Sequence, residues 1–544
     1  MKSVKKFSQY AGLLFLLILT YAVHVYHMGV YPWIDTSQMA EHATVTGTWI
    51  DKSKFGVNQL IVAGSDYNRG YTEGKFTQNI LNEQEKQLTV RLKRFFPNAL
   101  VLQAFELTII RWFYGIDIYL DPKNVNEMAG VARFASHDYD YLTDPISRQV
   151  AYHGLHEVGQ MMVDQTRNDM GCTVLAYPHG KNPEGKNRWM IGRNFDFEGG
   201  RVFDNDKVMK WIFPDEGYAL VSVIWAGMVG AVTGVNEKGV YISLNAAGST
   251  DFVRYGTPST LVLLKALQFA KDTDEAVEII RNSQMFITDI FVVSDRTTGK
   301  LYRVEKSPLF TEVIELKDAS VVTNHLISPR WRDDHINHFR EVELTSGARF
   351  TRGQALLKKL NGRAIDEETM VSFLRDKGQI DGKTLALGNR MAIDSQIATH
   401  SVVYNEETNE LFVSQGPSLA GAFFGFDLSA SFQKRTPVAT RVLPRDPLVS
   451  DETYQEIQSL RDLLAETNSL LKYKRCREAR ETLQKISSSI RETDYSYHAA
   501  LGDVNRCDGN LDVAKAEWTK ALALHPAYAS ETRDLEAKLQ KGKL

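Results

Sequence analysis

The feature that most constrains the fold is a change in the sequence pattern at Cys172. From there to about residue 445, short runs rich in β-branched and aromatic residues are separated by Gly, Asn and Asp, and amphipathic helical stretches fall between them. Such runs are typical of β-strands, and strands mixed with helices bury their apolar faces by stacking in layers. We therefore predict an α/β layered body, with stacked sheets covered by helices, over residues 172–445.

The segments on either side of this body have helical patterns. Residues 35–171 read as mostly helical, and residues 446–544 contain no strand pattern. Residues 495–526 match the 34-residue tetratricopeptide pattern, and a degenerate earlier unit is expected around residue 479. Two units fall short of a free-standing solenoid. We predict a helical tetratricopeptide-like tail that packs on the body or on a protein partner. The packing positions of this pattern are Leu501, Gly502, Ala514, Trp518, Ala521 and Pro526.

Residues 1–34 predict a membrane anchor. Lys2, Lys5 and Lys6 precede an apolar run from about Tyr10 to Val30, which is long enough to span a bilayer since roughly 17–25 residues suffice. No small-residue cleavage site follows the run, which favours an uncleaved signal anchor, a transmembrane helix, over a removed signal peptide. The lysines should stay in the cytoplasm, so we expect the body on the extracytoplasmic side.

Composition narrows the possible functions. The net charge is −3, with 64 basic and 67 acidic residues and no basic stripe with interleaved aromatics, so nucleic acid is not an expected partner. Among the three cysteines, Cys476 and Cys507 are expected to be buried free thiols of the tail. An anchored chain without disulfides fits a bacterial periplasm best. No cofactor is expected.

The third cysteine, Cys172, opens a predicted strand directly after Gly171. Glycine lets the backbone distort, so the thiol could attack the preceding carbonyl, form a thioester by an N-to-S acyl shift, and be released by water. Cleavage would uncover an α-amine with an ordinary pKa of roughly 7.7–8.0, which could serve as the base for its own thiol. The Gly171–Cys172 junction therefore predicts self-cleavage and an N-terminal nucleophile. The alternative is a buried structural cysteine.

Further motifs follow this junction in a fixed order. Together they resemble the N-terminal-nucleophile cysteine hydrolases, above all the acyl-coenzyme A:6-aminopenicillanic-acid acyltransferase-like family, with choloylglycine hydrolase and acid ceramidase as relatives. The likeness covers residues 55–425 and implies a four-layer αββα sandwich. The motifs are Gly171-Cys172-Thr173, Gly192-Arg193-Asn194-Phe195-Asp196, Gly234-Val235-Asn236-Glu237-Lys238-Gly239, Ser243-Leu244-Asn245 and Thr323-Asn324-His325.

The resemblance implies a role for each polar residue. Arg193 would lie beside Cys172, where a cation lowers the pKa of a thiol, and Asp196 would orient the new α-amine. Asn245 and Asn324 would donate to the oxyanion of the tetrahedral intermediate. A basic residue is also expected after the Thr-Asn motif. The candidates for it are Arg330, Arg332 and Arg340, of which Arg340 is preferred.

By the same resemblance, the chain would hydrolyse linear N-acyl amides through a thioester at Cys172. Transfer of the acyl group to an amine instead of water is the alternative activity. The substrate would be a small-molecule N-acyl amide, and the predicted anchor suggests an amphipathic one. The sequence does not identify it.

Two other interpretations remain open. A papain-type pair of Cys172 with His325 or His400 would also give a hydrolase, but no such signature surrounds Cys172. An envelope scaffold would keep a degenerate enzyme body and bind proteins through its tail. No metal site is expected. One cluster of possible ligands lacks the metalloprotease spacing, and a second, acidic pair could bind calcium but is better read as a loop. They are His153, His156 and Glu157, and the pair Asp204 and Asp206.

Overall fold

The computed structural model describes residues 43–541, except 97, 155, 156, 158, 161–169, 381 and 382. The predicted membrane anchor at residues 1–34 lies outside the described residues. Within them, every helix is too short or too polar to cross a bilayer.

Two large β-sheets form the centre of the body. The first has nine strands in the order β1-β2-β5-β6-β7-β8-β9-β10-β11, and the second has seven in the order β12-β3-β4-β15-β16-β17-β18. Neighbouring strands are antiparallel except β2 and β5, which run parallel. The strands of the first sheet are β1 (Gly47–Ile50), β2 (Asn58–Gly64), β5 (Val208–Pro214), β6 (Leu220–Ile224), β7 (Thr233–Asn236), β8 (Val240–Ala246), β9 (Asp289–Asp295), β10 (Leu301–Lys306) and β11 (Thr311–Glu315). Those of the second are β3 (Met170–Lys181), β4 (Asn187–Phe197), β12 (Ser320–Val322), β15 (Ala398–Asn405), β16 (Glu410–Ser414), β17 (Phe423–Asp427) and β18 (Ala439–Leu443), and a separate small hairpin pairs β13 (Gln379–Ile380) with β14 (Lys383–Thr384).

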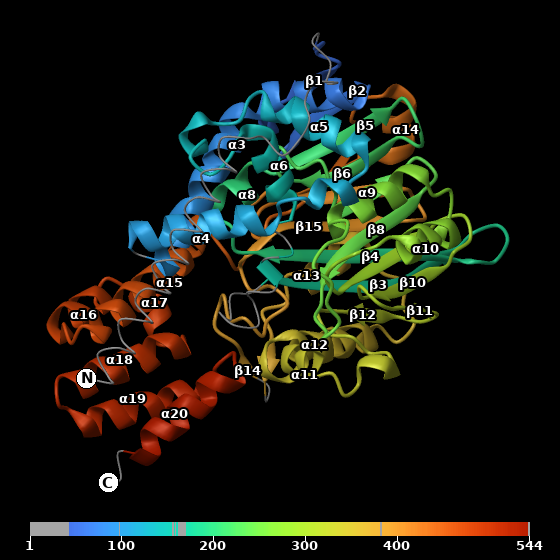
Figure 1. Ribbon diagram of the computed structural model, residues 1–544. Coiled ribbons are helices and arrows are strands. Elements are labelled where there is room, and N and C mark those ends of the chain that lie inside the picture. The colour runs from blue at the N-terminus through green and yellow to red at the C-terminus, as the bar shows by residue number, and fades with distance from the viewer. Residues whose placement is uncertain are drawn as a thin grey trace.

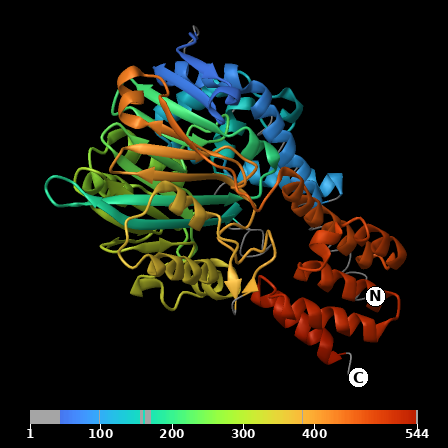
Figure 2. The same ribbon diagram turned by 180° about the vertical axis from the view of Figure 1, so that it is seen from behind.

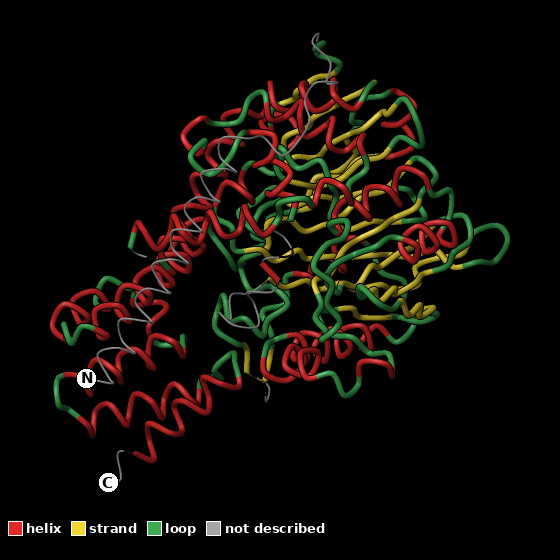
Figure 3. The backbone as a smooth tube through the Cα atoms, in the orientation of Figure 1, coloured by secondary structure: helices red, strands yellow, loops and turns green. Residues whose placement is uncertain are grey.

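The two sheets face each other across a shared apolar core. Strand residues alternate between faces, so Val174 and Ile191 of the second sheet point inward and meet Trp211 and Val221 of the first. Helices α5 (Pro122–Ala132), α9 (Ser259–Phe269) and α10 (Thr273–Asn282) cover the outer face of the first sheet. Helices α12 (Ser346–Leu360) and α13 (Glu367–Leu374) cover the second (Figure 1). The predicted α/β layered body is confirmed, with the strands sandwiched between helices (Figure 3).

The N-terminal segment is part of this body and not a separate helical unit. Its helices are α2 (Lys52–Phe55), α3 (Asp66–Phe95), α4 (Ala99–Trp112), α5 and α6 (Pro145–His153), with 3-10 turns η1 (Ile116–Tyr119) and η2 (His137–Tyr139). It also supplies β1 and β2, which the sequence pattern did not predict. Leu60 and Val62 of β2 are fully buried, since they pack into the core of the first sheet. Cleavage after Gly171 would therefore divide one continuous sheet between two chains.

Smaller elements connect the layers within the body. They are α8 (Arg201–Asn205), η3 (Pro329–Trp331), α11 (His335–His338), the π-helical turn η4 (Phe339–Glu343) and α14 (Leu428–Lys434).

The tail is helical, as predicted. It projects from one end of the body (Figures 1 and 2). It contacts the body through the packing of Tyr495 and Tyr528 near Leu344, and through ion pairs such as that between Arg533 and Glu343 at 2.6 Å. Ala514 and Trp518 are buried, and a side chain at Gly502 would meet the Trp518 ring at 2.4 Å, so the packing positions of the repeat pattern are used. Assignment to the tetratricopeptide family stays a prediction. The tail helices are α15 (Asp451–Lys472), α16 (Cys476–Leu483), α17 (Ser488–Arg491), α18 (Tyr495–Cys507), α19 (Leu511–Ala523) and α20 (Ala529–Lys541).

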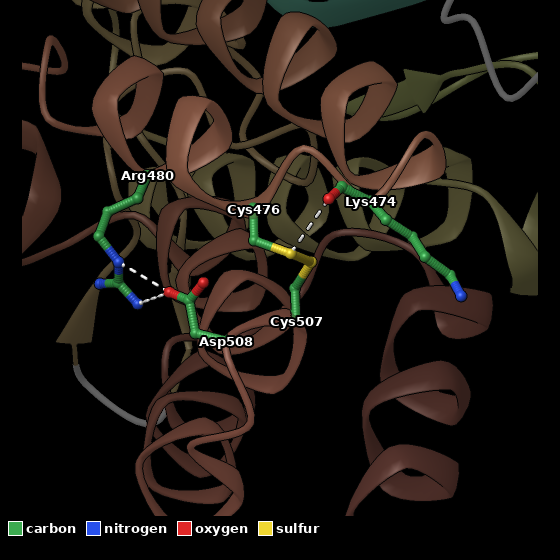
Figure 4. The surroundings of a disulfide bond; sticks show 5 residues. All are labelled: Lys474, Cys476, Arg480, Cys507 and Asp508. Atoms are coloured by element: carbon green, nitrogen blue, oxygen red, sulfur yellow. Dashed lines mark hydrogen bonds and ion pairs between the residues drawn. A yellow bond between two sulfur atoms is a disulfide. The ribbon is translucent and has the colours of Figure 1, made fainter.

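The expectation of free thiols in the tail was wrong. Cys476 and Cys507 form a disulfide, with Cα atoms 5.6 Å apart (Figure 4). The bond joins the start of α16 to the end of α18, and the ion pair between Arg480 and Asp508 reinforces the same contact at 2.6 Å. The two cysteines are 31 residues apart, and only the packing of α16 against α18 brings them together. A disulfide of this kind persists in oxidising compartments.

Candidate active site

Cys172 lies near the start of β3, on the face that points between the two sheets. It is 1% exposed and is paired with Phe195 of β4, while Gly171 is paired with Asp196. This register places the first two predicted motifs side by side. The motif residues Arg193 and Asp196 are thus fixed within the same ladder as the candidate nucleophile.

The thiol of Cys172 has two polar neighbours. Arg193 Nη2 lies 3.7 Å from Sγ, and Sγ lies 3.7 Å from the carbonyl oxygen of Leu244. Arg193 is fully buried and also donates to Leu244 O and Thr233 Oγ1. Burial raises the pKa of the Cys172 thiol, and this effect outweighs the lowering by Arg193. Arg193 is therefore where the resemblance placed it, but the thiol of the uncut chain is neutral.

A residue absent from the predicted set holds the backbone of Cys172. Arg349, in the first turn of α12, donates through Nη1 to Cys172 O at 2.5 Å and to Thr173 Oγ1 at 2.9 Å. Its Nη2 donates to Asn324 Oδ1 at 2.7 Å. One turn earlier, Ser346 Oγ accepts from the backbone N–H of Asn324 at 2.8 Å. The spacing of Ser346 and Arg349 on one helix face is the signal that could have identified this arginine.

The three arginines proposed from the sequence lie elsewhere. Arg330 pairs with Glu312 at 3.0 Å near the surface, and Arg332 is exposed. Arg340 is buried, and its Nη2 donates to the carbonyl oxygen of Gln160 at 3.0 Å. Among the arginines that follow the Thr-Asn motif, Arg349 contacts Cys172 and Arg340 binds Gln160, so the geometry favours Arg349 over the expected Arg340.

The two predicted asparagines flank the junction. Asn324 Oδ1 accepts from the backbone N–H of Cys172 at 2.9 Å, and its Nδ2 donates to Ala246 O at 2.8 Å. Asn245 Nδ2 donates to the carbonyl oxygens of Val322 and Thr323, both at 3.2 Å. The nitrogen that would become the α-amine therefore already has an acceptor in Asn324, a contact that the resemblance assigned to Asp196.

Gly171 lies in an extended strand in the uncut chain, and the backbone distortion expected during cleavage stays a prediction. Its role is spatial. A Cβ atom there would lie 3.0 Å from Asp196 Oδ2 and 3.4 Å from Arg349 Nη2. A side chain at this position would push these two charged groups slightly away from the Gly171–Cys172 bond.

We expect Gly171→Ala to slow self-cleavage, because the added methyl group would push Asp196 and Arg349 away from the junction. A matched control is Gly180→Ala in the same strand. A Cβ there would lie 3.0 Å from Glu407 Oε2, whose side chain is half exposed and can move aside. The cleavage half-time, followed by gel electrophoresis, should lengthen for Gly171→Ala alone. Equal rates in both variants would contradict the spatial role.

The two histidines of the papain-type alternative have other partners. His400 Nε2 lies 3.1 Å from Arg193 Nη1 and 2.9 Å from Thr233 Oγ1. His325 Nδ1 bonds to Ser346 Oγ at 2.8 Å. Burial lowers the pKa of His325 to about 4 and that of His400 well below its usual value, so both rings are neutral. Their contacts give this alternative no support.

The side chains of the two possible metal clusters are used in other contacts. His153 accepts from the backbone N–H of Val229, and Glu157 from that of Ser259. His156 lies outside the described residues. Asp204 pairs with Lys207 and Asp206 with Lys52, each at 2.7 Å. Among the residues that the structure describes, no group of three or more His, Cys, Asp or Glu could hold a metal ion.

A largely apolar cavity adjoins Cys172. Phe197, Trp225 and Met228 line it and also pack against the small cluster of Cys172, Phe195 and Val232. The opposite wall comes from α3 and α6 of the N-terminal segment. The lining residues from these helices are Leu81, Gln84, Glu85, Leu88, Gln149, Tyr152 and His153.

Comparison with known proteins places the central part of the chain near one enzyme family. Residues 182–385 match the model of the acyl-coenzyme A:6-aminopenicillanic acid acyl-transferase family. This range contains Arg193, Asp196, Asn245, Asn324 and Arg349, and it begins after Cys172. An uncharacterized protein of Archaeoglobus fulgidus is 22% identical over 191 residues, which are 33% of this chain and 31% of that protein. The chain therefore spans about a third of the length of this relative.

Solved structures with a similar arrangement are more distant. The N-acylethanolamine-hydrolyzing acid amidase ortholog of Caenorhabditis elegans is 16% identical with a TM-score of 0.31, over 50% of this chain and all (100%) of that one. A mutant conjugated bile acid hydrolase of Clostridium perfringens is 15% identical with a TM-score of 0.32, over 50% and 96% of the two chains. Another variant of that hydrolase is 15% identical with a TM-score of 0.34, over 51% and 100%.

Proposed function

We propose that this chain is a self-processing N-terminal-nucleophile hydrolase that cleaves linear amides through a thioester at Cys172. One observation carries the proposal. The backbone N–H and C=O of Cys172 are bound by Asn324 and Arg349, while its thiol faces Arg193. The family match over residues 182–385 supports it, because the three partner residues lie within that range. Any buried residue needs partners for its backbone N–H and C=O, so the contact that most favours a nucleophile over a structural cysteine is the buried Arg193 guanidinium beside the thiol.

Self-cleavage proceeds in two steps. The Cys172 thiol attacks the carbonyl carbon of Gly171, so that an S–C bond forms, the C–N bond breaks, and the departing nitrogen takes the thiol proton. Water then attacks the thioester, which releases the Gly171 carboxylate and returns a proton to the sulfur. Asn324 Oδ1, which already accepts from the Cys172 nitrogen at 2.9 Å, would receive the new amine. Asp196, paired with Gly171, would help to orient it.

The same atoms serve turnover of an amide substrate. The α-amine takes the proton of its own thiol, and the buried Arg193 guanidinium stabilises the thiolate. The thiolate attacks the amide carbonyl, the amine product leaves with a proton, and water hydrolyses the acyl-enzyme. By the family resemblance, Asn245 and Asn324 would donate to the oxyanion, each contributing roughly 3 kcal/mol to transition-state stabilisation. In the uncut chain their Nδ2 groups donate to the carbonyl oxygens of Val322, Thr323 and Ala246, so each residue would exchange one of these bonds for the oxyanion. In the acyltransferase alternative, an amine replaces water in the last step.

The apolar cavity indicates the substrate class. Phe197, Trp225 and Met228 offer an apolar surface next to Cys172, which suits the acyl part of an amphipathic N-acyl amide. The disulfide in the tail supports an extracytoplasmic location, as the predicted anchor does. The helical tail would bind a protein partner or hold the enzyme in place.

A substrate panel tests the proposal. Processed protein is incubated with N-acyl amino acids, N-acyl homoserine lactones, bile-salt conjugates and β-lactams, and the released amines are measured. We expect turnover of linear N-acyl amides and an acyl adduct on the chain that begins at Cys172, seen by mass spectrometry. An added amino-acid amine at moderate concentration separates the two activities, because a transferase would form the new N-acyl amide while a hydrolase would release the free acid. Processed protein that releases no amine and carries no adduct would contradict the proposed activity.

A further inference from the structure

The loop of residues 225–229 forms one wall of the apolar cavity. It follows β6 and carries Trp225 and Met228, which pack against the cluster around Cys172. The ring centroids of Trp225 and Phe197 are 4.8 Å apart, so this loop and the end of β4 close the cavity beside the nucleophile. Its position therefore fixes the shape of the space that an acyl chain would occupy.

Two side chains of the N-terminal segment hold the backbone of this loop. Glu73 Oε1, from α3, accepts from the N–H of Gly227 at 2.9 Å. His153 Nε2, from α6, accepts from the N–H of Val229 at 2.9 Å. The Nδ1–H of His153 donates to Gln149 O at 2.7 Å, which leaves Nε2 as the acceptor. Burial keeps this ring neutral by lowering its pKa to about 4.

Glu73 is itself held rigidly. Its Oε2 accepts from Lys210 Nζ of β5 at 2.6 Å, and the same ammonium group donates to Glu127 Oε1 of α5 at 2.9 Å. Arg69 Nη2 completes the network by donating to Glu127 Oε2 at 2.7 Å. All four side chains are almost fully buried. Glu73 is thus fixed between a core strand and the loop.

The loop is also shaped to fit α3. Gly227 has a φ of 77°, a left-handed conformation that favours glycine. A Cβ at this position would lie 2.7 Å from Leu81 Cδ1 of α3. Helix α3 thus contacts the same loop that the hydrogen bonds from Glu73 and His153 hold. The loop would keep this position after cleavage only if the N-terminal segment stays bound to the rest of the protein.

We propose that Glu73 and His153 are positioning residues that hold the loop of residues 225–229 against the acyl cavity, so that the N-terminal chain sets acyl-chain specificity in the processed enzyme. This inference rests on the proposed function for its substrate. Neither residue would touch the reacting atoms. Their effect would be on which acyl chains fit and not on bond cleavage itself.

The test compares Glu73→Ala with Glu73→Gln and Glu127→Gln in processed protein. Glu73→Ala removes the acceptor for Gly227, and we expect the ratio of kcat/KM for long over short N-acyl chains to change on the order of tenfold. Glu73→Gln keeps one acceptor oxygen for the N–H of Gly227, while its NH2 group would face Lys210, so its ratio should lie nearer to the wild-type ratio than that of Glu73→Ala does. Glu127→Gln disturbs the same Lys210 network without touching the loop, so it should lower the Tm and leave the ratio unchanged. Equal ratio changes in Glu73→Ala and Glu127→Gln would overturn the proposal.

Hydrogen exchange gives a readout that does not need activity. In wild-type protein the amides of Gly227 and Val229 should be protected, and Glu73→Ala should expose the first of them. His153→Ala should expose the second, and it provides the test if Glu73→Ala does not fold. Unchanged protection in the folded variants would overturn the role in positioning, whatever the substrate proves to be. Lost protection in a protein that hydrolyses no amide would instead locate the failure in the proposed function.

Discussion

Cys172→Ala is expected to remain a single uncut chain and to lose amide hydrolysis. The substitution removes the sulfur atom that would attack Gly171 and later the substrate, and the described neighbours of that atom include no second nucleophile. Loss of a covalent nucleophile lowers kcat by about 10⁴-fold or more, which is loss to background in most assays. Intact-mass analysis should show two chains in wild-type protein, one of which begins at Cys172, and one chain in the variant.

Two comparisons make this result specific. The double variant Cys476→Ala/Cys507→Ala removes the other cysteines and the tail disulfide, and it should still be cleaved at Gly171, since both residues lie in the tail. Wild-type protein that stays in one piece would exclude self-processing. It would favour the envelope scaffold, in which the polar residues around Cys172 are remnants of an inactive body.

The layered body could be predicted because its strands are local patterns. In runs such as residues 190–195 and 240–245, apolar residues alternate with polar ones or form short apolar stretches between turns. Each of these strands pairs with the strand just before it in the chain, so nearby residues are enough to predict it. Strand β2 gave a weaker signal. Its local antiparallel partner β1 is only four residues long and is separated from it by the short helix α2. Its other partner, β5, pairs with it in parallel, with Asn58 opposite Val208, and no local turn signals a partner so far along the chain.

The residues of the candidate site that could be predicted from the sequence are those that lie on neighbouring strands. Arg193 and Asp196 follow Cys172 by one hairpin, so the pairing of β3 with β4 carries them to the junction. Arg349 was missed because it lies in a helix, 25 residues after Asn324, and reaches Cys172 only through the packing of α12. The disulfide was missed for the same kind of reason. A sequence motif also does not predict how a side chain is oriented. Asn324 was expected to donate a hydrogen bond in the site, but it turns its acceptor oxygen to the N–H of Cys172.

Arg349→Ala is expected to lower kcat/KM by about 10²–10³-fold, and it is the strongest effect we expect outside Cys172. Arg349 is 3% exposed, and its fork binds Cys172 O and Asn324 Oδ1 together. Its removal takes the side-chain donor from Cys172 O and one of two donors from Asn324 Oδ1, so the Asn324 side chain is held less firmly, an effect of roughly 3–4 kcal/mol. Arg349→Lys should restore little, because an ammonium group cannot reproduce the two-pronged geometry.

The same helix offers the control. Arg352 lies one turn after Arg349 and pairs with Asp376 at 2.6 Å, on the half-buried side of α12. Arg352→Ala should lower the Tm without a comparable loss of kcat/KM, and Arg340→Ala should likewise affect catalysis less than Arg349→Ala does. The value of kcat/KM is measured on protein that mass spectrometry shows to be fully cleaved. For a variant that is cleaved too slowly to be isolated in the processed form, the half-time of self-cleavage is compared instead. A larger loss in Arg340→Ala than in Arg349→Ala would restore the arginine favoured by the sequence and remove Arg349 from the site.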